Sequence, residues 1–260
     1  MGRAAAALLW AWVSLLWGAE TSEKQFIDEC VREHNRARSA VSPEASDMLH
    51  MTWDEGLAIT AGAWARHCDF QHNIYRKDVR RMHPTFPSVG ENIWTGSPPS
   101  SFNITRAIKA WVDEKQHYDY GSNHCRHVCG HYTQVVWAKT YKVGCAVHVC
   151  PDGVKGFTPE EGAIFVCNYA PGGNVIGQQP YRRGSAACSG CGGVCKDRLC
   201  YDKERDSEKS YNWSPDWVPR TGHRDSDYWI ILVVRSVGVI LIFSAAYAVH
   251  YFYPDIFCYE

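Results

Sequence analysis

The chain has almost no net charge with which to attract a partner. Its 260 residues include 27 Lys or Arg against 28 Asp or Glu, which leaves a formal net charge of −1. Proteins that attract nucleic acids or anionic membrane surfaces over long range carry an excess of positive charge. The composition therefore indicates no such partner, and we expect no binding to nucleic acid.

Two hydrolase motifs that can be read along a sequence are also absent. The chain contains no G-x-S-x-G nucleophile elbow and no H-E-x-x-H zinc helix. A Ser-His-Glu triad is defined by its geometry rather than by spacing along the chain, so the sequence leaves that arrangement open.

Cysteine, by contrast, is abundant, with 12 residues. Residues 1–22 are predicted to be a secretory signal, because Arg3 precedes an apolar run at residues 4–16 that ends in small residues. Cysteines behind such a signal indicate an oxidising compartment and structural disulfides. Asn103 begins a glycosylation sequon, and Asn212 begins a weaker one because a proline follows it directly. We expect a glycoprotein of the secretory pathway.

A second apolar run covers residues 229–253. As a helix it would be about 37 Å long, enough to cross a hydrocarbon core of about 30 Å. Aromatic residues flank both ends, and Arg235 stands near one end, where its side chain can reach the interface. We predict a single-pass membrane protein with an extracellular N-terminal part and a cytosolic tail at residues 254–260. A lipid-anchor signal is the alternative, but the polar tail argues against it.

Between these two apolar segments, the hydrophobic periodicity predicts helices followed by strands. The predicted helices lie within residues 26–34, 57–68 and 104–112. The predicted strands are residues 131–137, 143–149 and 163–169. In the first of these strands, alternation would place His131 and Thr133 on one face and Tyr132 and Gln134 on the other. Helices and antiparallel strands in separate blocks predict an α+β fold.

Beyond residue 181 the apolar periodicity ends and four cysteines fall within 13 residues. They are Cys188, Cys191, Cys195 and Cys200. A segment this small needs covalent cross-links to fold, and its spacing would also suit a zinc knuckle. The preceding signal favours disulfides. Residues 202–227 are rich in charge, Pro and Ser and are predicted to be a stalk, which leaves shedding of the extracellular part open.

Four ordered motifs carry a resemblance to a known family. They are His-Asn-Arg-Ala-Arg at residues 34–38, Gly-Glu-Asn-Ile at 90–93 (expected in a loop), Gly-His-Tyr-Thr-Gln-Val-Val-Trp at 130–137, and residues 164–175. Over residues 24–178 the chain resembles the CAP superfamily, which comprises cysteine-rich secretory proteins, insect antigen 5 and plant pathogenesis-related class 1 proteins. The resemblance implies a three-layer α-β-α sandwich, followed here by a cysteine-rich hinge at residues 179–201.

The resemblance also implies a central cavity lined by two histidines and two glutamates, which fall on His72, Glu91, Glu114 and His131. Two imidazoles with a carboxylate and an open position are a suitable site for Zn²⁺. The alternative is that the four residues only tie loops together through buried hydrogen bonds. Asn35 and Tyr169 are expected to be scaffold residues that hold the motif loops.

The resemblance implies most of the disulfide pairing as well. The implied pairs are Cys68–Cys150, Cys145–Cys167, Cys188–Cys195 and Cys191–Cys200. Cys125 and Cys129, four residues apart, plausibly pair with each other. Cys30 is then left as a free buried thiol or an intermolecular bridge, unless the pairing of Cys125 with Cys129 is wrong.

Two functions from different classes follow. The first is a non-enzymatic extracellular binding module that binds a divalent metal, an extracellular protein partner, or a sterol or lipid, as the resemblance implies. The second is a zinc-dependent hydrolase, a protease or esterase, with Glu91 or Glu114 as base. No serine occupies any of the four motifs, so no nucleophile is indicated and we favour the binding module.

Overall fold

The structure is a computed structural model, and it describes residues 2–78, 80–209, 213–218 and 223–253. The chain divides into two compact units, residues 1–216 and residues 217–260. The predicted tail at residues 254–260 and the sequon at Asn212 lie outside the described residues.

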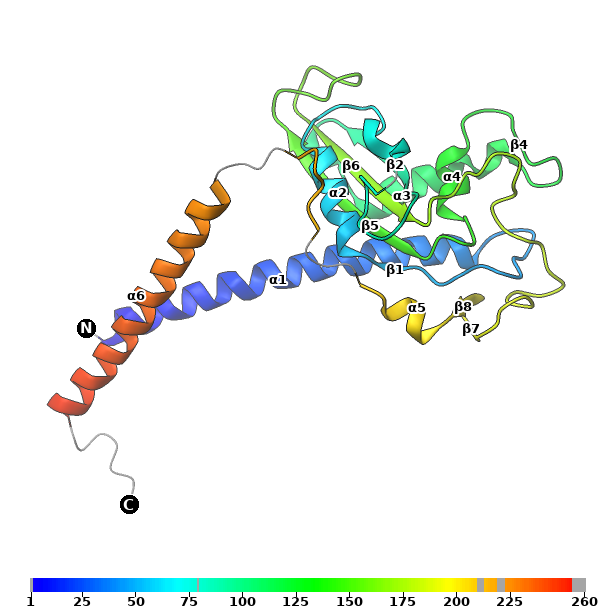
Figure 1. The fold of residues 1–260 in the computed structure, drawn as a ribbon. Helices are drawn as coiled ribbons and strands as arrows, with labels where there is room; N and C mark the ends of the chain where they lie inside the picture. Colours follow the sequence, from blue (N-terminus) through cyan, green and yellow to red (C-terminus); the bar gives the residue numbers. More distant parts are fainter. Residues whose placement is uncertain (1, 79, 210–212, 219–222, 254–260) are drawn as a thin grey trace. The chain divides into compact units, whose positions relative to one another are not determined.

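A four-stranded sheet forms the middle of the first unit (Figure 1). In spatial order its strands are β1 (Thr52–Trp53), β5 (Lys142–Cys150), β6 (Gly162–Ala170) and β2 (Gly90–Gly96). β1 is parallel to β5, and the other neighbours are antiparallel. Every residue of β6 is buried. The strands expected at residues 143–149 and 163–169 are confirmed as β5 and β6.

Helices cover both faces of this sheet. They are α1 (Gly2–Ser39), α2 (Glu55–Ala65), α3 (Ile104–Asp113) and α4 (Gly130–Val135). α2 packs against β5 and β6. It approaches so closely that a Cβ at Gly144 would lie 2.2 Å from the Ala58 nitrogen. On the opposite face, Phe165 of β6 stacks on Trp111 of α3, with ring centres 5.4 Å apart. The predicted helices and the three-layer α-β-α sandwich are therefore confirmed.

The strand expected at residues 131–137 is wrong: these residues begin in α4, a short helix. Its first residues are held by Glu114, whose Oε2 accepts hydrogen bonds from the backbone nitrogens of His131 (3.0 Å) and Tyr132 (3.4 Å). At its other end Arg38 donates to the Val135 carbonyl at 2.9 Å. Both helix ends are satisfied by residues distant in the sequence, so local β-propensity does not decide the structure.

The loop expected at residues 90–93 is also wrong, because these residues begin strand β2. β2 pairs with β6 along its whole length, with Glu91 opposite Asn168 and Asn92 opposite Cys167. A short polar motif has no clear alternation, and only pairing with a distant strand makes it a β-strand.

Short elements complete the first unit. The 3₁₀ helices are η1 (Ile74–Lys77), η2 (Pro99–Ser101) and η3 (Glu114–His117). Two small hairpins pair β3 (Tyr118–Asp119) with β4 (His124–Cys125) and β7 (Val194–Lys196) with β8 (Leu199–Tyr201). These short elements also include the helix α5 (Lys203–Ser207).

Five disulfides cross-link this unit, and they are the five expected pairs. They join Cys68–Cys150, Cys145–Cys167, Cys125–Cys129, Cys188–Cys195 and Cys191–Cys200. Cys30 is a free thiol buried in the core between the helices and the sheet. Of the open alternatives for Cys30, the structure therefore has the free buried thiol.

The segment after β8 lies against the domain. The buried Lys142 Nζ donates to Thr52 Oγ1 at 2.9 Å and also to the carbonyls of Asp206 and Glu208. Further along, the Trp213 indole donates to the Thr60 hydroxyl at 2.8 Å. The described part of residues 203–216 is thus held by specific hydrogen bonds.

The second unit contains one long helix, α6 (His223–Phe252). Within it, Val233–Phe252 is long and apolar enough to cross a membrane. At the other end of the chain, the predicted signal at residues 1–22 lies within α1, and removal of these residues would leave the later turns of that helix.

Candidate functional site

The first part of the site is a histidine–glutamate pair at the edge strand β2. His72, which follows α2, donates from Nδ1 to Oε1 of Glu91 at 2.9 Å. The same oxygen accepts the backbone N–H of Asn73 at 2.9 Å. The Glu91 side chain is fully buried, whereas 45% of the His72 side chain is exposed. A buried carboxylate therefore orients a histidine that faces solvent.

The second pair has the same design. His131, in the first turn of α4, donates from Nδ1 to Oε1 of Glu114 at 2.6 Å. Glu114 is the C-cap residue of α3, and its other oxygen accepts backbone N–H groups at the start of α4. The imidazole ring of His131 stacks on Trp111, with ring centres 6.2 Å apart and planes inclined by 16°. The carboxylate and the indole together fix the orientation of this ring.

Consecutive residues of β2 connect the two pairs. Glu91 binds His72, and the next residue, Asn92, donates from Nδ2 to the His131 carbonyl at 3.1 Å. The two histidines therefore lie at the same edge of the sheet. Asn92 was not singled out by the sequence analysis, although it stands within the Gly-Glu-Asn-Ile motif.

The Asn92 amide also reaches the buried scaffold. Its Nδ2 lies 3.3 Å from the Tyr169 hydroxyl, which donates to Nε2 of His34 at 2.8 Å, and His34 Nδ1 donates to the Cys30 carbonyl at 2.7 Å. Burial lowers the pKa of His34 to about 4 and raises the pKa of Tyr169 well above its usual value. Both groups are therefore neutral near pH 7. The expected scaffold role of Tyr169 is confirmed, and so is that of Asn35, which exchanges two hydrogen bonds with the Met51 backbone.

The geometry gives the four predicted residues two different roles. A histidine whose Nδ1–H binds a carboxylate presents its Nε2 lone pair to a metal, and the carboxylate acts as the supporting partner. Within the described residues, no three ligand atoms of this set lie within 4.8 Å of one another. The tetrad is thus arranged as two oriented imidazoles, each backed by a glutamate.

One buried atom favours a cation at this place. Glu91 Oε2 is buried and has no hydrogen-bond partner among the residues that the structure describes. An unsatisfied buried carboxylate oxygen is costly, and a cation or a cation-bound water would satisfy it. The donor set, two neutral imidazoles with carboxylate support, is one that Zn²⁺ accepts. The types of donor atom present are therefore compatible with the implied metal.

The rings of the two histidines contact no side-chain nucleophile in the described residues. Across the described ranges, neither His72 nor His131 hydrogen-bonds to a serine, threonine or cysteine; each ring bonds only to its glutamate. Both glutamates in turn accept backbone N–H groups. The arrangement is suited to holding an ion more than to activating a side-chain nucleophile.

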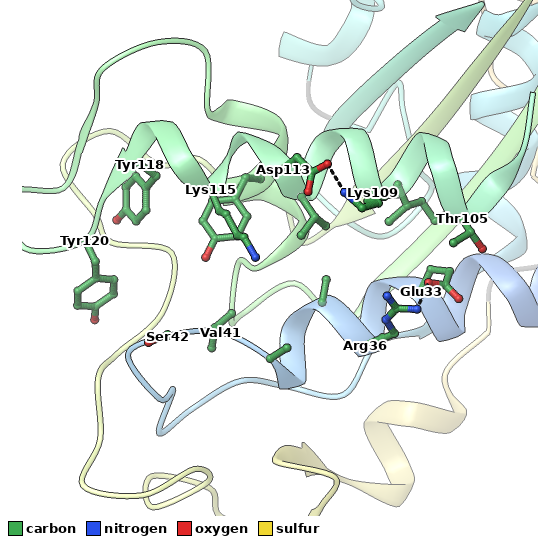
Figure 2. A pocket seen from close by; sticks show the side chains of 15 residues that line it. Glu33, Arg36, Val41, Ser42, Thr105, Lys109, Asp113, Lys115, Tyr118 and Tyr120 are labelled. Carbon is green, nitrogen blue, oxygen red and sulfur yellow. Dashed lines mark hydrogen bonds and ion pairs between the residues drawn. The ribbon is translucent and has the colours of Figure 1, made fainter.

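A separate groove lies between α1, α3 and the segment that follows α3 (Figure 2). Its volume is about 410 Å³. Val41, Ile108 and Val112 contribute apolar surface, and Arg36, Lys109 and Lys115 supply positive charge. Lys109 is paired with Asp113, whereas Lys115 is exposed. The groove combines an apolar lining with basic groups.

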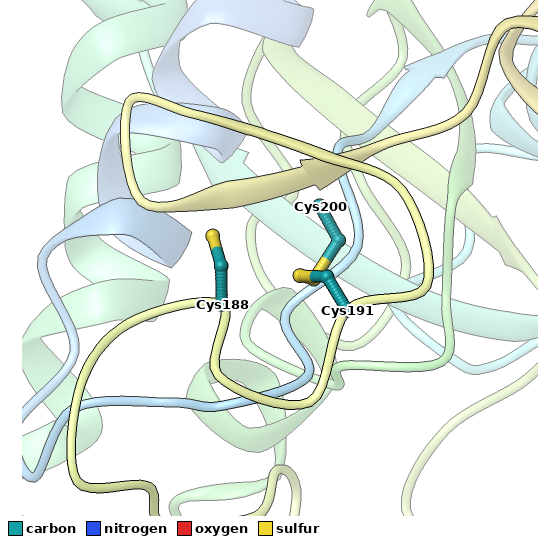
Figure 3. A group of neighbouring side chains, drawn as sticks. All are labelled: Cys188, Cys191 and Cys200. Atoms are coloured by element: carbon teal, nitrogen blue, oxygen red, sulfur yellow. A yellow bond between two sulfur atoms is a disulfide. The ribbon is translucent and has the colours of Figure 1, made fainter.

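A third cluster brings together the sulfur atoms of Cys188, Cys191 and Cys200 (Figure 3). Cys191 is bonded to Cys200, and Cys188 is bonded to Cys195. A sulfur atom in a disulfide is not a thiolate and does not serve as a zinc ligand in the way a knuckle requires. The hinge is therefore a disulfide-bonded segment, as expected, and the zinc-knuckle alternative is not supported.

Comparisons with known proteins agree with this architecture. The profile of the cysteine-rich secretory protein (CAP) family matches residues 31–169. GLIPR1-like protein 1 of Bos taurus is 50% identical over 194 residues, which cover 74% of this chain and 78% of that protein. Glioma pathogenesis-related protein 1 of Mus musculus is 42% identical over 241 residues, 91% of this chain and 88% of that protein. The crystal structure of NaASP2 with Zn²⁺ is 28% identical in sequence to this chain, with a TM-score of 0.53. The match covers 67% of this chain and 94% of NaASP2.

Proposed function

Because this chain belongs to the cysteine-rich secretory protein (CAP) family, we propose that it is a non-enzymatic extracellular binding module that holds a divalent metal such as Zn²⁺ between His72 and His131. The observation that carries the proposal is the pair of Nδ1–carboxylate hydrogen bonds, at 2.9 and 2.6 Å. Each hydrogen bond engages Nδ1 of its imidazole and leaves the lone pair of Nε2 for a metal. The crystal structure of NaASP2 was determined with Zn²⁺, which supports the same ion here.

In this proposal Glu91 and Glu114 support the ligands rather than act as bases. Their hydrogen bonds keep each histidine in the tautomer that can bind metal through Nε2. Bound Zn²⁺ would supply a Lewis acid and an anchoring point for an extracellular protein partner. The burial of Glu91 keeps its carboxylate in place whether or not the metal is bound.

The module is proposed to be held at the cell surface by α6. The apolar segment Val233–Phe252 is long enough to span a bilayer. With the predicted signal at residues 1–22, this arrangement would put the domain outside the cell and the C-terminal end inside. Resistance of the full-length chain to extraction by alkaline carbonate would support the membrane span, and release by that treatment would contradict it.

A lipid ligand is a second candidate function, favoured by the groove of Figure 2. Its volume of about 410 Å³ lies in the range of small-molecule sites. The apolar lining, together with Lys115 beside the ion pairs Arg36–Glu33 and Lys109–Asp113, suits an amphiphile with an acidic headgroup. A sterol, the other ligand implied by the family resemblance, would use the apolar lining but not the charges.

The alternative of a zinc-dependent hydrolase requires Glu91 or Glu114 to accept a proton from water. Both carboxylates already accept hydrogen bonds from an imidazole and from backbone N–H groups. These contacts favour an orienting role. Hydrolysis of a peptide by the purified chain, abolished in Glu114→Gln, would favour the hydrolase over the binding module.

Calorimetric titration of Zn²⁺ into the metal-free, full-length chain in detergent micelles tests the proposed metal site of His72, Glu91, Glu114 and His131 (the cleft site). We expect one bound Zn²⁺ per chain to be lost in His72→Gln and in His131→Gln. Glu91→Gln and Glu114→Gln should weaken the same equivalent by about 10- to 100-fold, because supporting carboxylates tune metal affinity to that extent. His148→Gln, on β5, is the matched control. Unchanged binding in both cleft histidine variants, with circular dichroism intact, would overturn the proposal.

A further inference from the structure

We propose that His117 and His127 form a second metal site, for a transition-metal dication such as Zn²⁺ or Cu²⁺, beside the β3–β4 hairpin. The centres of the two imidazole rings are 4.9 Å apart, and the ring planes are inclined by 81°. His117 ends η3, and His127 follows β4 by two residues. This site is independent of the His72 and His131 cleft.

The ring separation agrees with shared coordination. With metal–nitrogen bonds of about 2.0–2.1 Å and ring centres about 1.1 Å behind the nitrogens, two imidazoles on one tetrahedral or square-planar ion lie about 4.5–5.2 Å apart, centre to centre. The observed 4.9 Å falls within this interval. An ion could therefore be bound with little movement of the backbone, and water would fill the remaining coordination positions.

The hairpin holds the two histidines in place. The register pairs Tyr118 with Cys125, and the next bond in line joins the Arg126 nitrogen to the His117 carbonyl at 2.8 Å. The disulfide between Cys125 and Cys129 closes a short loop around His127. Because the loop is already cross-linked, ordering it on metal binding costs little entropy.

Both imidazoles are available to a ligand. His127 is exposed and His117 is half-buried. In the part of the chain that the structure describes, no hydrogen bond or ion pair engages either ring, and their contact is with each other. By contrast, His34 and His83 are fully buried and bond through their ring nitrogens to protein groups. A surface pair with free nitrogens is the arrangement in which imidazoles bind metal.

The charges near the pair do not oppose a cation strongly. Arg126 lies between the histidines in sequence, and it interacts electrostatically with Asp119 on β3. That carboxylate offsets the guanidinium charge. A dication bound by imidazoles, which are neutral ligands, is therefore tolerated at this surface.

The experiment is equilibrium dialysis of the metal-free, full-length chain in micelles against Zn²⁺, with metal analysis. His117→Gln and His127→Gln should each lose one equivalent of bound Zn²⁺, with affinity lowered roughly ten-fold or more, since loss of even a supporting residue has that effect. His124→Gln, on the same hairpin, is the matched control and should bind like the wild type. Cu²⁺ bound to His72→Gln, in which the first site is disrupted, should show two imidazole nitrogens by electron paramagnetic resonance.

The two proposed sites can fail separately. If only the hairpin site exists, His127→Gln abolishes binding and His72→Gln leaves it unchanged. If only the cleft site exists, the results are exchanged, and the hairpin proposal is wrong. Wild-type binding in both His117→Gln and His127→Gln, or a copper spectrum without two nitrogens, would equally overturn it.

Discussion

The Tyr169 hydroxyl donates to Nε2 of His34 at 2.8 Å, across 135 residues of chain. This bond joins α1 to β6 inside the core, and it continues through Asn92 to the backbone of His131. His34 and Tyr169 are both fully buried. The position of His131 therefore depends on a polar network whose other side chains are all buried.

Tyr169→Phe should destabilise the domain by about 1–3 kcal/mol, because it leaves the buried His34 Nε2 without a donor. The measurement is urea unfolding of the disulfide-intact chain, followed by tryptophan fluorescence. Tyr201→Phe is the control, because its half-exposed hydroxyl makes no hydrogen bond within the described residues; its effect should stay within about 0.5 kcal/mol. Equal effects of the two substitutions would contradict the network.

The stability of the domain should fall as the pH drops below about 6.5. Burial lowers the pKa of His34 from 6.5 to about 4. Between these values the unfolded chain binds a proton that the native state excludes, so the stabilisation present above pH 6.5 is lost progressively as the pH falls toward 4. The loss from this group is on the order of 3 kcal/mol.

Unfolding free energies of wild type and His34→Gln, measured from pH 7.5 to 4, check this expectation. The variant will be less stable at pH 7, but its stability should vary less steeply with pH in this window. The difference between the two curves isolates His34 from His50 and His148, whose pKa values burial also lowers. Parallel curves would show that His34 does not carry the pH dependence.

The extent to which the site can be predicted from sequence differs between its parts. Hydrophobic periodicity predicts the amphipathic helices and the buried strands β5 and β6. The motif resemblance predicts His72, Glu91, Glu114 and His131. The structure of residues 130–137 could not be predicted locally, because α4 depends on Glu114 at its start and on Arg38 at its end. The pairing of each histidine with its glutamate likewise depends on contacts between β2, α3 and the loops, which no local pattern encodes.

Arg38→Lys should destabilise the domain by about 3–5 kcal/mol. Within the described part of the chain, the buried guanidinium of Arg38 donates to five backbone carbonyls and pairs with no carboxylate. These carbonyls belong to Leu49, Val135, Trp137, Ala138 and Thr140. A lysine offers three donors at one point, so several buried carbonyls would lose their partner. Arg36→Lys, with a side chain 72% exposed, is the control and should change stability by less than about 0.5 kcal/mol. Thermal denaturation in parallel distinguishes the two.

Lys142→Met should release the segment that follows β8. Removal of the ammonium group leaves the carbonyls of Asp206 and Glu208 without their donor. Hydrogen–deuterium exchange of peptides from residues 203–209 should therefore accelerate, while exchange in β6 stays slow. Lys139→Met, at an exposed position, is the matched control. Unchanged exchange in Lys142→Met would mean that the segment is held by other contacts, such as the hydrogen bond from the Tyr141 hydroxyl to Glu208 Oε2 at 3.1 Å.

Filling the groove between α1 and α3 should abolish lipid binding without damage to the core. Ala40 lines this groove from an exposed position, so Ala40→Trp adds bulk there and displaces no buried side chain. Binding of a fluorescent long-chain fatty acid should weaken by about ten-fold or more, which corresponds to about 1.4 kcal/mol. Gln116→Trp, an exposed position outside the groove, is the control. Lys115→Gln should weaken binding of the fatty acid but not of a fluorescent sterol, because only the fatty acid has a carboxylate that the lysine can bind. Equal binding by Ala40→Trp and the wild type would place any lipid site elsewhere.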